Sequence, residues 1–331
     1  MDELISIDHG SGGQKTAQLI EQLFLPHFSD PVLGQLGDGA VLEGFEKIAF
    51  STDSFVVEPL FFPGGDIGKL AVCGTVNDLA MCGAEPMYLS CGFIIEEGFP
   101  VKDLEKIVSS MAQQAKSAGV RIVTGDTKVV QKGRGDGIYI NTAGVGKLLW
   151  PGLGRERLEP GDEILISGSM GDHGAAVMLA RNDLLQGELE SDCQALNGLS
   201  KALLELGGVK LLRDPTRGGL ATTLNEFVEG SELGIELMER DIPVKPQVQA
   251  ACDMLGLDPL YCANEGKLIA VVSADKAEAA LELARSMPEG RDAAIIGKVS
   301  RQWPGKLVMQ TAFGGRRLLQ KLSGAQLPRI C

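Results

Sequence analysis

The sequence predicts an α/β protein of two domains, and three observations lead to that prediction. The 331 residues are about twice the size of a common single domain, which is enough for two hydrophobic cores. The first half alternates strand-like and helix-like segments, and the second half opens with a strand, a glycine-rich turn and a helix. Hydrophobic residues make up 44% of the chain and charged residues 23%, a composition typical of globular proteins.

The first domain is assigned to residues 1–150. Strands are expected at 47–51 and 138–145, where β-branched and other apolar residues gather. The segment 101–118 carries apolar residues at helical spacing, and Gly119 follows it as a helix-ending residue. These segments predict helices layered on a sheet.

Clusters of turn residues at 149–154 and 159–162 mark the boundary between the two domains. The second domain is assigned to residues 155–315. It opens with a strand at 163–167, passes through a glycine-rich turn and enters a helix near Ala175. This order of strand, loop and helix is typical of α/β layers.

A short C-terminal segment, residues 316–331, follows the second domain. It has a basic start and a brief apolar stretch, and then small residues and Pro328. Such a segment has little apolar surface to bury, so we expect a partly mobile tail. This tail carries Cys331 at its end.

The overall charge limits the classes of partner. A formal net charge of −13 argues against nucleic acid or an anionic membrane, because both require a positive face that displaces counterions. No apolar run approaches the roughly 20 residues that span a bilayer, and the start of the chain lacks the basic residues of a signal peptide. We therefore expect a cytoplasmic enzyme. If it binds an anionic nucleotide, it needs divalent cations, backbone donors or lysines at the site.

The seven cysteines include no C-x-x-C pair, which indicates reduced thiols rather than a disulfide framework. Cys73, Cys82 and Cys91 recur every nine residues, a spacing that could suggest metal ligands. Their strand and helix neighbours favour small buried core residues instead.

Five aspartates stand among small residues. Alone, each is explained as a turn or helix-cap residue. Together they predict a magnesium-nucleotide site, because carboxylates repel one another at short range unless cations lie between them. Asp53 and Asp126 are expected just beyond strands or at strand ends, where carboxylates can converge over a sheet. The five residues are Asp38, Asp53, Asp78, Asp126 and Asp214.

The phosphate-binding loops of common nucleotide enzymes are missing. Residues 63–70 fail the Walker A pattern at both its first glycine and its magnesium-binding Ser or Thr. Residues 9–16 are a better candidate, because their glycines expose backbone N–H groups and Lys15 adds a positive charge. An ordinary helix cap explains the same residues. The glycine loop 168–174 is explained equally well by close helix packing.

The motifs around these residues resemble the ATP-binding superfamily of aminoimidazole ribonucleotide synthetase and selenophosphate synthetase, across both domains. Besides the aspartate loops, the resemblance is carried by residues 77–86 and 214–220. A selenophosphate synthetase would carry a cysteine or selenocysteine in its N-terminal glycine loop, and residues 6–16 contain none. Within the superfamily the chain closely resembles the HypE family of hydrogenase maturation factors, on residues 9–13, 37–40, 124–128 and 328–331.

The resemblance implies a two-domain ATP-binding fold of the aminoimidazole ribonucleotide synthetase type. The N-terminal domains of a homodimer would pair into a shared β-barrel with ATP in the cleft beside it, flanked by a C-terminal α/β sandwich. The implied cofactors are ATP and Mg²⁺, with the five aspartates as metal ligands. Several relatives have a second acidic residue where this chain has Gly39, so the number of Mg²⁺ ions stays open. The implied cofactor-binding residues are Gly12, Gly13, Lys15, Asp38, Asp53, Asn77, Asp78, Thr124, Gly125, Asp126 and Asp214.

The resemblance also implies the reaction. The partner HypF would place a carbamoyl group on the sulfur of Cys331, and this chain would use ATP to dehydrate that group to a thiocyanate. The cyanide would pass to iron held by the HypC and HypD proteins, for a nickel-iron hydrogenase. The implied catalytic residues are Cys331, Lys128 and Glu265; Glu265 takes the amide proton and Lys128 counters charge on the oxygen.

Two alternatives stay open on the sequence alone. The chain could be a small-molecule ATP-dependent synthetase of the same superfamily, for which Cys331 would be incidental. It could also be a non-catalytic, nucleotide-gated scaffold for maturation partners. Whether the tail acts in its own subunit or across the dimer is open as well.

Overall fold

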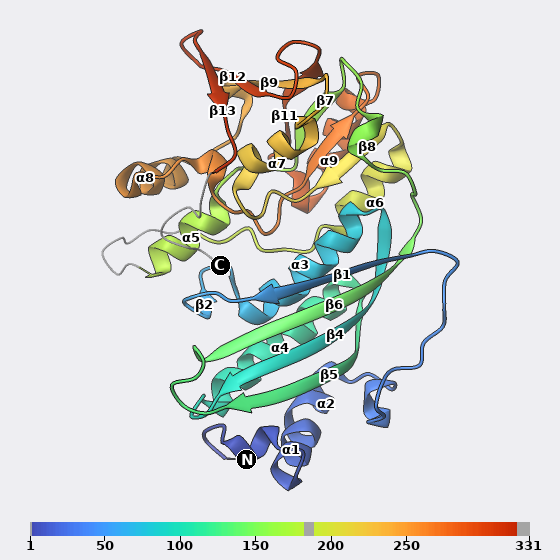
Figure 1. The fold of residues 1–331 in the computed structure, drawn as a ribbon, viewed down its shortest axis with the longest axis vertical. Helices are drawn as coiled ribbons and strands as arrows, with labels where there is room; N and C mark the ends of the chain where they lie inside the picture. The colour runs from blue at the N-terminus through green and yellow to red at the C-terminus, as the bar shows by residue number, and fades with distance from the viewer. Residues whose placement is uncertain (1, 182–188, 323–331) are drawn as a thin grey trace.

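The structure is a computed structural model that describes residues 2–181 and 189–322, so the expected cargo residue Cys331 lies outside it. Two sheets organise the described residues, one in each half of the chain. The N-terminal half begins with short helical segments that lie beside one edge of its sheet (Figure 1). These segments are η1 (Ile7–Gly10), α1 (Gln14–Leu19), η2 (Ile20–Phe24), α2 (Leu25–Phe28) and η3 (Leu33–Gln35).

The N-terminal sheet has four long strands in the order β1-β6-β4-β5. Strand β6 pairs antiparallel with both β1 and β4, and β4 pairs parallel with β5. Within the described residues this sheet is open, with β1 and β5 as its two edges. The strands are β1 (Ile48–Phe55), β4 (Ala84–Glu96), β5 (Arg121–Val130) and β6 (Ile138–Leu148), and a small hairpin is formed by β2 (Phe61–Phe62) and β3 (Gly65–Asp66).

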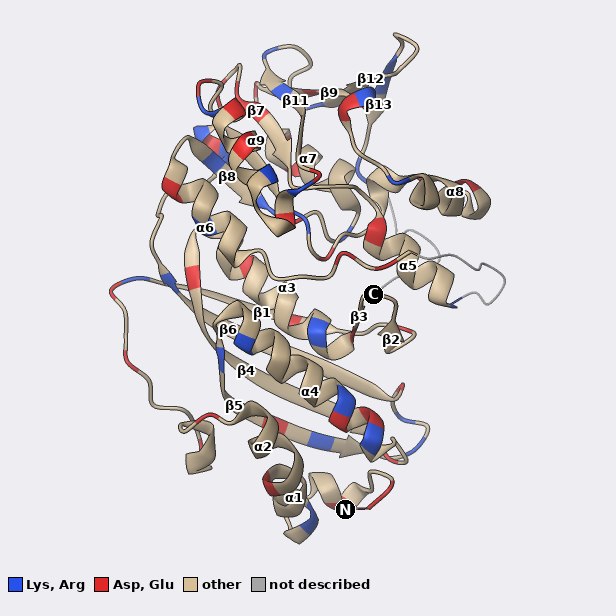
Figure 2. Ribbon diagram, turned by 180° about the vertical axis from the view of Figure 1, so that it is seen from behind, with Lys and Arg blue, Asp and Glu red and all other residues tan. Residues whose placement is uncertain are grey.

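Helices α3 (Ile67–Met81) and α4 (Val101–Ala118) cover one face of this sheet (Figure 2). Helix α4 forms because its apolar residues fall on one stripe, which includes the fully buried Leu104 and Met111. Gly119 ends it in the left-handed conformation at φ 72°. The N-cap of helix α3 is Asp66, whose side chain accepts hydrogen bonds from two backbone N–H groups of the first turn.

The opposite face of the sheet carries no helix and is turned toward the viewer in Figure 1. Large apolar side chains stand exposed on it: Ile48 is 55% exposed, Phe50 66% and Ile94 46%. Exposed apolar residues gathered on one face often mark an interaction surface.

The C-terminal half is built on a seven-stranded sheet in the order β13-β12-β9-β11-β7-β10-β8. Alternate residues of its central strands point into two separate apolar cores, one with helix α7 and one with helices α6 and α9. The strands are β7 (Glu163–Ile166), β8 (Val209–Arg213), β9 (Gly234–Met238), β10 (Ile269–Val272), β11 (Ala294–Ser300), β12 (Leu307–Gln310) and β13 (Arg316–Leu319). The helices are α5 (Asp172–Arg181), α6 (Asn197–Leu206), α7 (Gly219–Val228), α8 (Pro246–Leu255) and α9 (Ala277–Ser286), with η4 (Arg155–Arg157), η5 (Glu239–Asp241), η6 (Pro259–Tyr261) and η7 (Pro288–Gly290) as connectors.

Most of the expected elements are present. The helix at 101–118 and its end at Gly119 are confirmed, and the strands expected at 47–51, 138–145 and 163–167 are found with shifted ends. Among the described residues, no helix is both long and apolar enough to cross a bilayer.

Two expectations are wrong. The tail does not start at Arg316, because Arg316–Leu319 pairs with β12 as strand β13 and buries Leu319. Cys82 is not a core residue: it is the C-cap of α3 and is exposed, whereas Cys73 and Cys91 are buried as expected.

Candidate active site

A cleft of about 310 Å³ lies where the edge strand β1 and helix α3 meet the C-terminal half. Four of the carboxylates singled out in the sequence line it, each supplied by a different segment of the chain. Its acidic residues include Asp53 from β1, Asp78 from α3, Asp214 from the loop after β8, and Glu265 from the loop before β10.

Local contacts hold the two N-terminal aspartates in place. The hydroxyl of Ser51 donates a hydrogen bond to Asp78 Oδ2 at 2.6 Å, and the Ser54 N–H donates to Asp53 Oδ1 at 3.0 Å. Gly74 lies opposite them on α3. A Cβ at Gly74 would stand 2.9 Å from the ring of Phe55 and 3.6 Å from Asp53 Oδ2, so only glycine lets the helix approach the strand this closely.

The carboxylates of this cleft repel one another and are partly removed from water. Burial, reinforced by the charge of Asp78, raises the pKa of Asp214 to about 7. Burial and Asp78 also raise the pKa of Asp53. A divalent cation relieves this repulsion, and carboxylate oxygens are the ligands that Mg²⁺ prefers, so the donor set fits this ion. In the described part of the chain, no three acidic, His or Cys side chains lie close enough together to hold a metal ion by themselves.

Glu265 is the most deeply held acid of the cleft and is only 7% exposed. Its own N–H donates to Asp192 Oδ1 at 3.1 Å, and the following residue, Gly266, lies directly against the Asp192 carbonyl. Burial, with the nearby Cys193 and Asp214, raises the pKa of Glu265 well above the usual range. A carboxyl group in such a setting can accept a proton near neutral pH, which is the property of a general base.

Asn77 is 1% exposed and does not line the cleft. Its amide nitrogen donates to the carbonyl oxygens of Gln194, at 3.1 Å, and Glu265, at 3.4 Å, and its oxygen accepts from Leu196 N–H at 2.8 Å. The side chain therefore fastens α3 to the two C-terminal segments that shape the site. Its expected role in cofactor binding has no contact in this cleft to support it.

Two arginines of the cleft were not singled out in the sequence. Arg217 lies 3.8 Å from Asp53 Oδ1 with its side chain 79% exposed, and Arg213 lines the same cleft. Both stand in the motif that contains Asp214, so the signal was their position next to a candidate metal ligand. A guanidinium group beside the carboxylates suits an oxyanion of a phosphate.

The other predicted residues lie along a second groove at the far edge of the sheet. Thr124, Gly125, Asp126 and Lys128 of β5 line it together with Gly12. Lys128 Nζ pairs with Asp126 Oδ1 at 2.9 Å, both exposed, and this bond lowers the pKa of Asp126. The exposed Asp38 lies on the long connection to β1, and its glycine neighbours line this groove.

The two sites are far apart within one protomer. Asp53 pairs with Thr142, Thr142 with Cys91, and Cys91 with Gly125, so three strand spacings of about 4.8 Å each separate the two edges. Asp126 is the neighbour of Gly125 and therefore points to the opposite, helix-free face. The expectation that Asp53 and Asp126 lie just beyond strands or at strand ends is wrong, because both lie inside the edge strands β1 and β5, which continue through these polar residues.

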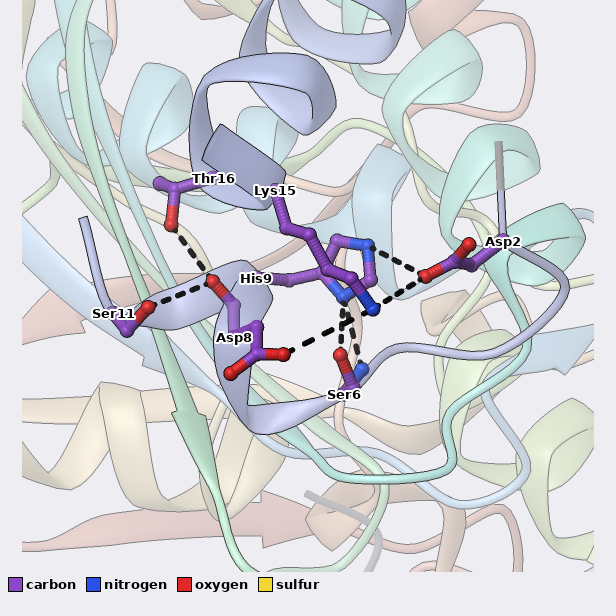
Figure 3. A network of polar contacts seen from close by, with 7 residues as sticks. All are labelled: Asp2, Ser6, Asp8, His9, Ser11, Lys15 and Thr16. Atoms are coloured by element: carbon purple, nitrogen blue, oxygen red, sulfur yellow. Dashed lines mark hydrogen bonds and ion pairs between the residues drawn. The ribbon is translucent and has the colours of Figure 1, made fainter. Parts of the chain in front are cut away.

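The glycine loop at 9–16 lies beside β5, and its polar groups already have partners (Figure 3). Lys15 Nζ pairs with Asp2 at 2.9 Å and approaches Asp8 at 3.9 Å. The Gly12 N–H donates to Thr16 Oγ1 at 2.9 Å, and Gly13 is the N-cap of α1. A phosphate bound here would have to replace these internal contacts.

Comparison with known proteins agrees with the two-part architecture. The AIR synthase related protein family matches over both halves, with its N-terminal domain at residues 36–148 and its C-terminal domain at residues 159–310. Among solved structures below 25% identity, a thiamine monophosphate kinase from Aquifex aeolicus shares the fold, with a TM-score of 0.61 at 18% identity over 94% of this chain and 99% of that one.

Closer relatives are similar over their full length. The carbamoyl dehydratase HypE of Azotobacter vinelandii is 53% identical over 99% of this chain and 97% of its own, and that of Escherichia coli is 49% identical over 99% of each. A crystal structure of hydrogenase maturation protein HypE in complex with ATP matches with a TM-score of 0.95 at 52% identity, covering 98% of this chain and 99% of that one. HypE in a HypE–HypF complex matches with a TM-score of 0.80 at 51% identity, covering 92% and 99%.

Proposed function

This chain belongs to the HypE family of AIR synthase related proteins, and from that premise we propose how it works as an ATP-dependent carbamoyl dehydratase in hydrogenase maturation. The cargo is an S-carbamoyl group on Cys331, and the product is a thiocyanate on the same sulfur. The observation that carries the proposal is the buried Glu265 beside the carboxylate cluster of Asp53, Asp78 and Asp214.

The carboxylate cluster would hold Mg²⁺ and, through it, the triphosphate. Asp53, Asp78 and Asp214 offer oxygen ligands whose mutual repulsion a cation relieves. Arg217 stands at the same cleft and would pair with a phosphate oxygen. When bound, magnesium ATP supplies the phosphoryl group that turns the carbamoyl oxygen into a leaving group.

In the dehydration step the protein holds the carbamoyl group in position and supplies a base. The carbamoyl oxygen departs as phosphate, the nitrogen loses both protons, and a carbon–nitrogen triple bond forms while the carbon–sulfur bond is kept. Glu265 is suited to take a proton from nitrogen, because burial makes its carboxylate basic. Lys128 would offset negative charge on the oxygen before it leaves.

Lys128 lies on β5, at the opposite edge of the sheet from the strand β1 that lines this cleft. We propose a homodimer in which the edge strand β1 of one protomer lies beside β5 of the other, so that the two helix-free faces enclose a β-barrel. The unpaired edges of β1 and β5 and the exposed Ile48, Phe50 and Ile94 support this arrangement. It would also bring Asp126 and the glycine loop of one protomer to the aspartates of its partner.

The proposed partners follow from the cargo. The HypE–HypF complex of a relative supports HypF as the enzyme that loads the carbamoyl group. The HypC and HypD proteins would receive the cyanide, and all of these steps are assigned to the cytoplasm. No role for nucleic acid or a membrane is proposed.

Phosphate release tests the link between ATP and the cargo. In a single turnover, one phosphate should appear for each loaded chain, and a Cys331→Ser variant that cannot be loaded in the same way should release almost none. A small-molecule synthetase of the same fold would keep its ATP turnover in the Cys331→Ser variant. That outcome would overturn the proposal.

A further inference from the structure

The charges of this chain are distributed unevenly along the sequence. All seven charged residues after Asp292 are basic, which leaves 24 of the 31 basic and all 44 acidic residues in the first 292 positions. The basic residues are Lys298, Arg301, Lys306, Arg316, Arg317, Lys321 and Arg329. The proposed site uses none of them, so this region needs another explanation.

Five of the seven lie on or beside the β12–β13 hairpin, which is at the far end of the molecule from the N-terminal helices (Figure 1). Lys298 lies on β11, and Arg329 is outside the described residues. Arg317 pairs with Asp258 at 2.7 Å, and Lys321 pairs with Glu229. Within the described residues Arg301, Lys306 and Arg316 form no ion pair. These three exposed cations therefore give the hairpin a positive surface, and Figure 2 colours the basic residues of β13 blue.

Neighbouring carboxylates do little to neutralise this surface. Asp258 and Glu229 are used in the pairs above, and Glu239 accepts the Ala312 N–H at 2.7 Å, which holds the hairpin turn. Glu232 adds one negative charge at the border, in the turn whose next residue, Leu233, accepts the Gly305 N–H.

Exposed apolar side chains stand among the same cations. Phe313 at the tip of the hairpin is fully exposed, Leu318 on β13 is 45% exposed and Trp303 is 38% exposed. The Arg316 guanidinium lies over the Trp303 ring, 5.7 Å from its centre. Tryptophan and arginine side chains are enriched in protein interfaces, so their exposure side by side here favours a binding surface.

The hairpin leads directly to the cargo residue. Two hydrogen bonds fix the chain just beyond β13: Asn225 Nδ2 donates to the Leu319 carbonyl at 3.1 Å, and the Tyr261 hydroxyl donates to the Gln320 carbonyl at 2.8 Å. The nine residues that follow Leu322 can span at most about 30 Å. Any enzyme that works on the Cys331 sulfur outside the cleft therefore stands close to this surface.

We infer that Arg301, Trp303, Lys306, Phe313, Arg316 and Leu318 form the docking surface for the enzyme that loads the carbamoyl group, and that this partner presents an acidic face with an apolar centre. The inference rests on the proposed function, in which a separate enzyme loads Cys331. The basic surface of the hairpin favours an acidic protein as the partner. The remainder of this chain is strongly acidic and would repel such a partner elsewhere.

Loading kinetics test the docking surface. The second-order rate constant for carbamoyl transfer from the purified loading enzyme to Cys331 is measured at low and at high ionic strength. The double variant Arg301→Glu with Arg316→Glu should lower it at least tenfold at low ionic strength, and the difference should shrink at high ionic strength. Phe313→Ser should lower it at both. The control Lys116→Glu, on the exposed face of α4, should change it less than twofold.

Folding and the dehydration step are checked separately in the same variants. Each variant is loaded chemically with cyanate, which adds to a thiol to give the same S-carbamoyl group, and its C-terminal peptide is followed by mass after ATP is added. The docking variants should dehydrate this group at the wild-type rate. Loading that is equally fast in wild type and in the double variant overturns the docking surface, whereas a failure of the loaded wild type to dehydrate overturns the proposed function instead.

Discussion

At the scale of single residues, the cleft holds carboxyl groups that are largely removed from water, which disfavours their charged form. Asp214 and Glu265 are both buried, and both have a pKa raised first by that burial. The sequence pointed to both, but only through motifs, because burial is a property of the folded chain. Arg217 was missed as a site residue because its contact with Asp53 depends on the fold, and nothing in the sequence spacing indicates it.

Asp214 gives the site a pH-dependent stability. Its pKa is about 7 in the folded chain against 3.8 for a free side chain, so the folded state holds the proton more tightly. Its contribution to the free energy of unfolding is therefore present below pH 3.8 and is lost as the pH rises through about 7. In the proposed site Mg²⁺ would compete with this proton, so it should raise the melting temperature more at pH 8 than at pH 6.

Thermal melts of the wild type and of Asp214→Asn check this prediction. The variant should be more stable than the wild type without metal at pH 8, by at least about 1 kcal/mol, or ~2–4 °C. It should also lose most of the Mg²⁺-induced increase. An equal Mg²⁺ effect in the two proteins would mean that Asp214 is not a ligand.

At the scale of elements, the sequence predicted the helices and strands more completely than it predicted the site. Helix α4 was foreseen to its last residue because its apolar spacing and Gly119 are local signals. The ends of β1 were not, because the strand continues through polar residues such as Asp53 that pair with β6. The sequence predicts a tail where strand β13 lies, because a strand of four residues depends on pairing with its neighbour β12, and no local pattern reveals that pairing.

Asn77 shows how one element can position another. An Asn77→Ala variant leaves the carbonyls of Gln194 and Glu265 and the N–H of Leu196 without their partner. We expect a loss of about 1–3 kcal/mol in the free energy of unfolding, and a lower dehydration rate because the Glu265 loop loses its support. The affinity for ATP should change little.

Urea denaturation and ATP titration separate the two roles of Asn77. Asn197→Ala is a matched control, since Asn197 also joins the two halves of the chain, through the Ala118 carbonyl at 2.9 Å. That variant should lower stability with the dehydration rate kept. If Asn77→Ala instead keeps its stability and loses ATP affinity, the residue binds the nucleotide directly.

At the scale of the whole molecule, the predicted site residues divide between the two edges of the N-terminal sheet. If the residues in these motifs form one active site, two chains must supply them. A single sequence does not reveal which residues come from which copy, because both copies carry all of them. The exposed Phe50 and Ile94 on the helix-free face became visible only in the fold.

Mixing two inactive variants tests the shared site. Asp53→Ala and Lys128→Ala should each lose dehydration activity, since each removes one half of every site. In a mixed dimer one of the two sites has both residues intact, so random exchange should restore about a quarter of wild-type activity. Asp53→Ala mixed with Glu265→Gln should restore none, because both residues belong to the same side of the cleft.

An absence of recovery in the first mixture, with exchange of subunits verified by mass, would contradict the two-chain site. Recovery in the second mixture would contradict the grouping of Asp53 with Glu265. The two mixtures therefore check the arrangement of the site independently of how fast it works.

The central claim is that the carboxylate cleft removes the oxygen of cargo held on the terminal sulfur. The most direct measurement is the mass of the C-terminal peptide of the carbamoylated protein before and after magnesium ATP is added. We predict that the wild-type peptide loses the mass of one water molecule, and that the Glu265→Gln peptide keeps its mass at least a hundredfold longer. An unchanged wild-type peptide, or equal loss in both proteins, would contradict the account.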